Sequence, residues 1–135
     1  MPVIDASVLV EYLTGAEHAS QAREAVLGEI ERLWAPHLID AEVGHVLRRA
    51  AAIRAIGAGR AQEALSDLVE LPIKRVPHLG LLERAFELRS NISFYDALYV
   101  ALAERLEMPL LTFDARLQRA ARSTADVRLI RGGDQ

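Results

Sequence analysis

The sequence of 135 residues contains no cysteine and only one lysine, Lys74. The lack of cysteine excludes disulfide bonds and thiolate metal ligands, which leaves oxygen and imidazole groups as the available ligands and suits a reducing compartment. The other fifteen basic residues are arginines, whose planar guanidinium groups favour bidentate contacts with phosphate or carboxylate. A GC-rich genome would produce the same bias, so both explanations of the arginine excess stay open.

Long uncharged segments are also missing. The longest runs without Asp, Glu, Lys or Arg have seven residues, as from Ala97 to Ala103, whereas a membrane-spanning helix needs about 20 apolar residues. Asp5 and Glu11 lie where an export signal needs a basic segment followed by an uncharged one. We therefore expect a soluble, cytoplasmic protein with no membrane contact. A formal net charge of −3 gives no general attraction to polyanions.

The hydrophobic pattern predicts a single α/β domain over residues 1–135, because short apolar runs alternate with amphipathic segments of helical period. Such alternation favours a mainly parallel sheet, since parallel neighbours are joined by crossover helices. The expected strands are residues 2–4, 33–35, 73–76, a run that ends just before Asp114, and 127–130. The expected helices are 6–15, 18–32, 38–54, 60–71 (with Leu65 inward), 79–89, one that begins after Ser93, and 115–122.

Two aspartates lie where parallel sheets of this kind bind ligands, at the carboxyl ends of strands, and a third begins a helix. Asp5 and Asp114 directly follow predicted strands, and Asp96 falls in the first turn of the helix after Ser93. Each also has a structural explanation: Asp5 and Asp114 suit helix N-caps, and Ser93 with Asp96 forms the S-x-x-D version of a capping box. Asp40, early in another helix, is expected to be solvated or to interact favourably with the helix dipole.

Glu42 lies on the flank of the apolar stripe of helix 38–54, which includes Val46 and Ile53. A carboxylate in such a place is costly unless it is paired. Either a nearby arginine, Arg48 or Arg49, or a metal ion would stabilise it.

If Asp5, Glu42, Asp96 and Asp114 converge, their carboxylates repel one another by roughly 1 to 4 kcal/mol per close pair. Hard divalent cations such as Mg²⁺ or Mn²⁺ offset this repulsion and favour carboxylate and water oxygens. A site of this kind suits phosphodiester hydrolysis. The sequence leaves open whether it holds one ion or two.

Three segments resemble the PIN-domain ribonucleases, and most closely the VapC toxins of bacterial toxin–antitoxin pairs. They are IDAS at residues 4–7, Glu42 in an apolar helix after Pro36, and SFYDALYVALAERLEMPLLTFD at residues 93–114. The similarity covers essentially the whole chain. It implies a PIN-like three-layer sandwich and Mg²⁺- or Mn²⁺-dependent endoribonuclease activity. It also implies a homodimer that is neutralised by a cognate antitoxin, whose tail occupies the acidic groove.

The family's acids correspond to Asp5, Glu42, Asp96 and Asp114, all present here, and its frequent hydroxyl companions correspond to Ser7 and Thr112. The two hydroxyls are expected to support the site, although a hydroxyl near a helix start also commonly binds backbone N–H groups. An acidic site that holds RNA needs basic residues at its rim. The candidates, which also suit a solvated helix face, are Arg116, Arg119 and Arg122, with Arg48 and Arg49 as secondary choices.

Two rival functions remain. An aspartate-nucleophile phosphotransfer or phosphatase domain would use Asp5, but such chemistry usually needs a well-placed lysine, and Lys74 sits in a strand bounded by prolines. A non-catalytic PIN-like interaction domain would use the acids only as helix caps. The four histidines show no H-E-x-x-H spacing, which argues against a zinc hydrolase.

Overall fold

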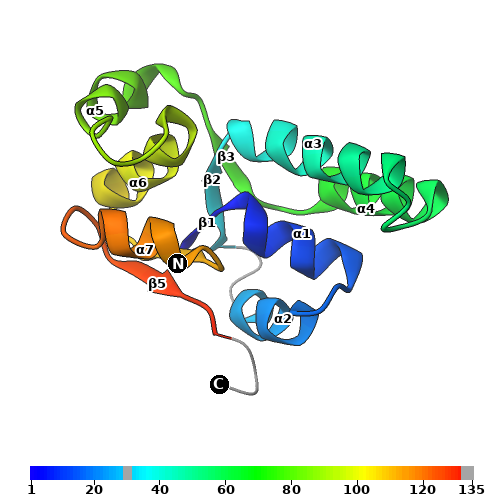
Figure 1. Cartoon of the computed structure of the whole chain (residues 1–135). Helices are drawn as coiled ribbons and strands as arrows, with labels where there is room; N and C mark the ends of the chain where they lie inside the picture. The colour runs from blue at the N-terminus through cyan, green and yellow to red at the C-terminus, as the bar shows by residue number, and fades with distance from the viewer. Residues whose placement is uncertain (29–31, 132–135) are drawn as a thin grey trace.

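A five-stranded parallel sheet forms the centre of the computed structural model, which describes residues 1–28 and 32–131 (Figure 1). The strand order is β3-β2-β1-β4-β5, and every neighbouring pair is parallel. The strands are β1 (Val3–Ile4), β2 (Trp34–Pro36), β3 (Lys74–Val76), β4 (Leu110–Thr112) and β5 (Val127–Leu129).

Helices cover both faces of this sheet. Right-handed crossovers place the helices between β1 and β3 on one face and those between β3 and β5 on the other, as Figure 1 shows. The first group is α1 (Ala6–Thr14), α2 (Ala19–Leu27), α3 (Leu38–Ala52) and α4 (Ala58–Glu70); the second is η2 (Leu79–Leu81), α5 (Leu82–Glu87), α6 (Phe94–Leu106) and α7 (Ala115–Ala121). The α/β three-layer arrangement expected from the sequence is confirmed.

Helix α6 is the most enclosed helix of its layer. It packs against β1, β2 and β4 and also against α5, and residues 97–103 are all buried. An apolar helix of this kind, hydrophobic all round, is covered by protein on all sides. Within the described ranges, no helix combines the length and the apolar character needed to cross a membrane.

The order in which strands are added to the sheet changes direction at β1. The chain adds β2 and β3 on one side of β1 and then adds β4 and β5 on the other side. Such a switch point opens a crevice beyond the carboxyl ends of the strands. The register pairs Ile4 with Leu111, so that Asp5 and Thr112 follow as neighbours at this edge.

Several predicted boundaries were wrong by one to five residues. Residues 29–31 of the predicted helix 18–32 lie outside the described residues, and α2 ends at Leu27. The strand predicted to end before Pro36 includes it, and the helix predicted to begin at residue 60 begins at Ala58 as α4. Segment 79–89 begins as a 3₁₀ turn and is α-helical only over Leu82–Glu87.

Three apolar side chains predicted to face the core are exposed instead: Val46 (40%), Ile53 (70%) and Leu65 (44%). The buried residues of α3 are Ile39, Val43 and Leu47, which follow one another at intervals of four. This narrow stripe forms the buried face of α3, because residues at i and i+4 share a helix face.

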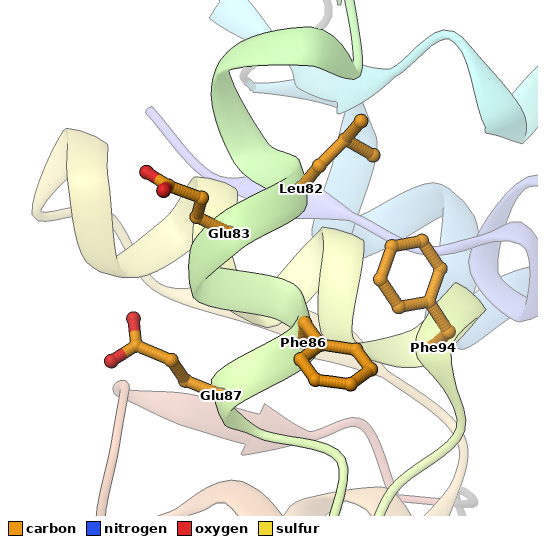
Figure 2. Close-up of a pocket in the computed structure, with 5 residues that line it drawn as sticks. All are labelled: Leu82, Glu83, Phe86, Glu87 and Phe94. Atoms are coloured by element: carbon orange, nitrogen blue, oxygen red, sulfur yellow. The ribbon is translucent and has the colours of Figure 1, made fainter.

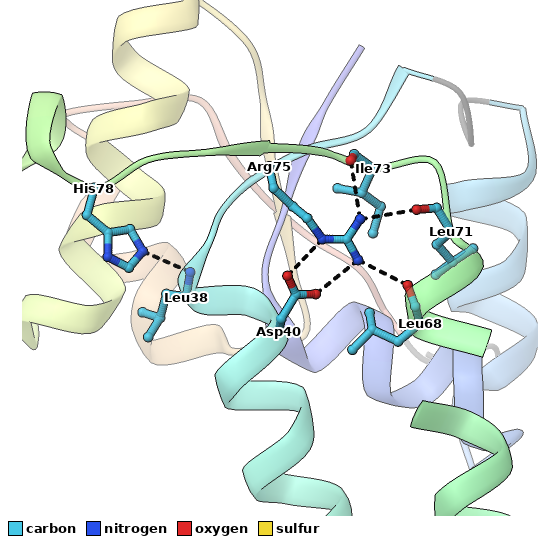
Figure 3. A network of polar contacts seen from close by, with 7 residues as sticks. All are labelled: Leu38, Asp40, Leu68, Leu71, Ile73, Arg75 and His78. Carbon is cyan, nitrogen blue, oxygen red and sulfur yellow. Dashed lines mark hydrogen bonds and ion pairs between the residues drawn. The ribbon is translucent and has the colours of Figure 1, made fainter. Parts of the chain in front are cut away.

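Asp40 lies in the first turn of α3, as the helix-dipole alternative requires, and it also forms a bidentate ion pair with Arg75 that was not predicted (Figure 3). The guanidinium Nε and Nη2 lie 2.8 and 2.9 Å from the two carboxylate oxygens. Arg75 also donates to the backbone carbonyls of Leu68, Leu71 and Ile73. These carbonyls belong to the end of α4 and the loop after it, where helical partners run out. Arg75 therefore joins α3, α4 and β3.

Candidate functional site

Asp5 is a buried carboxylate, 7% exposed, at the carboxyl end of β1. It accepts hydrogen bonds from the hydroxyls of Ser7 (2.6 Å) and Thr112 (2.5 Å), one on each oxygen. Each hydroxyl in turn accepts a backbone N–H, Ser7 from Phe113 and Thr112 from Asp114. The two hydroxyls therefore fix both oxygens of Asp5 and tie the loop after β4 to the start of α1.

Burial raises the pKa of Asp5 from its ordinary value of 3.8 to about 6. The hydrogen bonds from Ser7, Thr112 and the Val8 N–H oppose this rise in the pKa, and the negative charge of Asp96 adds to it. The 3.4 Å bond from Val8 also makes Asp5 the N-cap of α1. The capping interpretation is thus correct for Asp5, but capping does not require burial of the charge.

Asp114 follows β4 and caps α7. Its Oδ1 atom accepts the backbone N–H groups of Arg116 (2.9 Å) and Leu117 (3.2 Å). These bonds satisfy two of the N–H groups that have no partner within the helix. Its second oxygen is not used by the cap.

Asp96 differs from the other two aspartates because its carboxylate is not a cap. The hydroxyl of Ser93 accepts the backbone N–H of Asp96 at 3.1 Å. The reciprocal bond of a capping box, from the Ser93 N–H to the Asp96 carboxylate, is not formed among the described residues. Burial raises the pKa of Asp96; the Ser93 hydroxyl and the positive charge of Arg116 lower it, while Asp114 raises it further.

Glu42 is paired with a tyrosine rather than with an arginine. The hydroxyl of Tyr99 donates to Glu42 Oε1 at 2.6 Å, so the predicted pairing with Arg48 or Arg49 is wrong. Burial raises the pKa of Glu42, the Tyr99 hydroxyl lowers it, and the charge of Asp96 raises it. The sequence signal for Tyr99 was its position three residues after Asp96, on the same side of α6.

The four acids form an electrostatic cluster around Asp96. The negative charge of Asp96 raises the pKa of both Asp5 and Glu42, and Asp114 raises that of Asp96. Asp96, Asp114 and Arg116 also line one cavity of about 330 Å³. Within residues 1–28 and 32–131, however, no three acidic or histidine side chains are already arranged to hold a metal ion.

The chemistry of this cluster nevertheless fits a hard divalent cation. Asp96 and Asp114 line a shared cavity, and Mg²⁺ is commonly bound by one or two carboxylates while several waters complete its shell. Asp5, Glu42 and Asp96 are half-buried or buried acids with raised pKa values. A bound cation would stabilise their ionised forms, which the protein itself does only in part.

The three candidate rim arginines differ in position. Arg116 lines the cavity that contains Asp96 and Asp114, and its charge lowers the pKa of Asp96. Arg119 and Arg122 are exposed and do not line this cavity. The regular spacing of the three residues along the sequence could not separate them, because it does not show which side of α7 faces the acids.

The lysine and a histidine that phosphotransfer could use lie away from the four acids. The ammonium group of Lys74 is 5.0 Å from the centre of the Trp34 ring, on the edge strand β3 and apart from the residues that line the acidic cavity. The imidazole Nε2 of His78 accepts the Leu38 N–H at 2.8 Å at the start of α3, as Figure 3 shows. Neither residue is placed to assist phosphotransfer on Asp5.

Comparison with known proteins agrees with this geometry. The family model described as PIN domain matches residues 3–123. Ribonuclease VapC1 of Mycobacterium tuberculosis is 44% identical over 130 residues, which cover 96% of this chain and 97% of that protein. The match therefore spans both proteins nearly from end to end.

Two solved structures have the same fold. VapC20 of Mycobacterium tuberculosis, described as a sarcin–ricin loop cleaving toxin, has a TM-score of 0.72 at 18% identity and covers 95% of this chain and 99% of its own. A chain of a toxin–antitoxin complex from Klebsiella pneumoniae has a TM-score of 0.67 at 17% identity, with 97% and 98% covered. The family model and the 44% identical relative establish that the chain belongs to the PIN domain family and, within it, to the VapC proteins.

Proposed function

We propose that this chain is a metal-dependent endoribonuclease that hydrolyses RNA phosphodiester bonds as the toxin of a toxin–antitoxin pair. The observation that carries the proposal is the position of Asp96. Its carboxylate caps no helix, is repelled by Asp114, repels Asp5 and Glu42, and lines a cavity together with Asp114 and Arg116. A role in stability does not explain this arrangement, whereas the name of VapC1 supports a ribonuclease.

In this proposal the four acids hold the metal ion, and two hydroxyl groups orient one of the acids. Asp96 and Asp114, which line the cavity, would hold Mg²⁺ or Mn²⁺ together with Asp5 and Glu42. The bound cation supplies Lewis-acid activation of water and neutralises charge on the phosphoryl oxygens. Ser7 and Thr112 keep the Asp5 carboxylate in one orientation through the hydrogen bonds described above. Such preorganisation matters because misplaced ligands weaken metal sites.

Incubation of the purified protein with a defined panel of RNAs tests the proposal. We expect endonucleolytic cleavage with Mn²⁺ or Mg²⁺, none with excess EDTA, and recovery when the metal is added back. Asp5→Ala should be inactive under all conditions, and a DNA panel of the same sequences serves as the substrate control. Metal-independent cleavage would contradict the proposal, and an acyl-phosphate trapped on Asp5 would favour the phosphotransfer alternative.

Arg116→Ala is expected to weaken RNA binding, because Arg116 is the basic residue beside the acids. Loss of one phosphate contact should reduce the slope of log K against log salt concentration by about 0.7 for single-stranded RNA. Fluorescence anisotropy at several salt concentrations, with EDTA to prevent cleavage, measures this slope. The matched control is Arg119→Ala on the same helix, which should leave the slope unchanged. If both substitutions change the slope equally, Arg116 is no more important for RNA binding than Arg119.

The proposal includes a protein antitoxin as the partner. A structural neighbour is part of a toxin–antitoxin complex, and the acidic cavity favours a segment with basic side chains, which would occupy it in place of RNA. Co-expression with the product of the adjacent reading frame should yield a complex that cleaves no RNA. Full activity of that purified complex would argue against this partner.

A homodimer is proposed through the α5–α6 patch, which consists of Leu79, Leu82, Phe86 and Phe94. Their side chains are 38% to 83% exposed, and the last three line a pocket of about 640 Å³. Figure 2 shows Leu82, Phe86 and Phe94 on one side of α5, with the pocket's acidic residues on the other. Exposed apolar patches of this kind commonly mark protein interfaces.

Phe86→Glu is therefore expected to convert a dimer into a monomer, because it places a charge in the apolar contact. Light scattering coupled to size-exclusion chromatography measures the mass. Val69→Glu is the matched control, since Val69 is 73% exposed on α4, outside the patch. A wild-type protein that is monomeric at high micromolar concentration would contradict this proposal.

A further inference from the structure

Tyr99 connects the two helical layers at the acidic cluster. It lies on α6, three residues after Asp96, and its side chain is 1% exposed. Its hydroxyl donates to Oε1 of Glu42 on α3 at 2.6 Å. The bond thus joins the helix that carries Asp96 to the helix that carries Glu42.

The ring of Tyr99 is anchored while its hydroxyl remains at the site. The ring is one of the largest fully buried side chains in the described part of the chain, so the position of the hydroxyl is fixed by the core. The hydroxyl of a tyrosine ordinarily carries its proton at neutral pH, since its usual pKa is about 10, so it is available to donate to Glu42.

Glu42 needs such an anchor. Its long side chain has freedom to turn toward solvent, and the negative charge of Asp96 repels its carboxylate. A buried tyrosine usually finds a hydrogen-bond partner, but a backbone carbonyl would satisfy it equally well. Here the partner is one of the four acids of the cluster, and the bond holds that acid against the repulsion.

We propose that Tyr99 is a positioning residue for the metal site: its hydroxyl holds the Glu42 carboxylate beside Asp96, where both acids serve the same cation. The inference rests on the proposed function, because it assigns Tyr99 a task within the metal-dependent reaction. Residues that hydrogen-bond to metal ligands orient them, and their loss typically lowers metal affinity by about 10- to 100-fold.

Tyr99→Phe tests this role, since it removes the hydroxyl and keeps the ring in the core. We expect Mn²⁺ affinity, measured by titration calorimetry, to fall by about 10- to 100-fold. RNA cleavage should fall at limiting Mn²⁺ and recover at saturating Mn²⁺, which a misfolded fraction would not do. The matched control is Tyr12→Phe on α1, a tyrosine that lines a different pocket, which should leave both quantities unchanged.

A double-mutant cycle with Glu42→Gln separates positioning from a general packing effect. In the Glu42→Gln background, Tyr99→Phe should cause no further loss of Mn²⁺ affinity, because the carboxylate that it positions is already absent. Independent, multiplicative losses would overturn the inference, as would unchanged Mn²⁺ affinity in Tyr99→Phe. In both cases metal-dependent cleavage by the wild type would leave the proposed function standing, whereas a wild-type protein that binds no Mn²⁺ and cleaves no RNA would overturn both.

Discussion

Asp96→Asn is expected to abolish Mn²⁺-dependent RNA cleavage, by about a thousandfold or more, while leaving the protein folded. Metal-ion catalysis supplies several kcal/mol of transition-state stabilisation, which corresponds to rate factors of this size. The asparagine keeps the shape of the side chain and removes its charge. Gel-based cleavage assays measure the activity, and calorimetric titration measures the accompanying loss of Mn²⁺ affinity.

The structure explains why folding should survive this substitution. The N-cap of α6 consists of the Ser93 hydroxyl and the backbone N–H of Asp96, and neither group changes in Asp96→Asn. The lost charge repels Asp5 and Glu42 and is repelled by Asp114. Without metal, the free energy of unfolding should therefore stay equal or rise slightly.

Ser93→Ala provides the reciprocal control, because it removes the cap and keeps the carboxylate. Loss of an N-cap side chain costs about 1 kcal/mol of stability, so the thermal midpoint should fall while cleavage persists at temperatures where the protein is folded. The two variants thus separate capping from chemistry. If Asp96→Asn binds Mn²⁺ and cleaves RNA like the wild type, the metal site at Asp96 is excluded.

Much of this fold could be predicted from the sequence, because its strongest signals are local. The turn at Gly15 has a positive φ of 67°, which glycine adopts at little cost, and it marks the end of α1. The S-x-x-D sequence at Ser93 correctly indicated the start of α6. Asp5 and Asp114 were correctly placed after parallel strands, since the alternation of strands and helices already determines which strand ends share one edge.

The remaining details depend on contacts between distant residues. Asp40 pairs with Arg75, 35 positions away, and Glu42 with Tyr99, 57 positions away. Helical spacing compares residues within one element, so Arg48 and Arg49 were the only protein partners that it offered for Glu42 beside a metal ion. It also could not show that the Asp96 carboxylate does not cap the helix, because the capping box and the single Ser93 cap share one sequence pattern.

The free energy of unfolding of the metal-free protein is expected to fall by about 2 kcal/mol between pH 4.5 and pH 7.5. Asp5 is the main cause, since burial raises its pKa from 3.8 to about 6. Between these two values the folded protein binds a proton that the unfolded chain has already released, so folding is linked to proton uptake. Stability is therefore highest at acid pH and is lost as the pH rises through the folded pKa.

Other acids of the cluster act in the same direction. Glu42 and Asp96 also have raised pKa values, although their partial exposure makes their contributions smaller. Arg84 lowers the pKa of Glu104, so this pair makes the protein more stable as the pH rises. Its effect on stability is essentially complete above the ordinary pKa of 4.5 and therefore does not offset the fall within this range. Solvent screening also weakens this exposed ion pair.

Urea unfolding with EDTA at several pH values measures the decline, and Asp5→Asn is the variant that separates its cause. The asparagine changes the hydrogen bonds of Ser7 and Thr112 and thereby the stability at every pH, but it cannot titrate, so the slope against pH should flatten. Mn²⁺ should reverse the trend and stabilise the protein more at pH 7.5 than at pH 4.5, because the ion binds ionised carboxylates. Two results would show that burial does not hold the Asp5 carboxyl in its protonated form. One is a free energy of unfolding that rises with pH for the wild type in EDTA, and the other is an unchanged pH dependence in Asp5→Asn. The same experiment links stability to function, since the buried carboxyls whose ionisation destabilises the metal-free protein are the groups proposed to bind the metal.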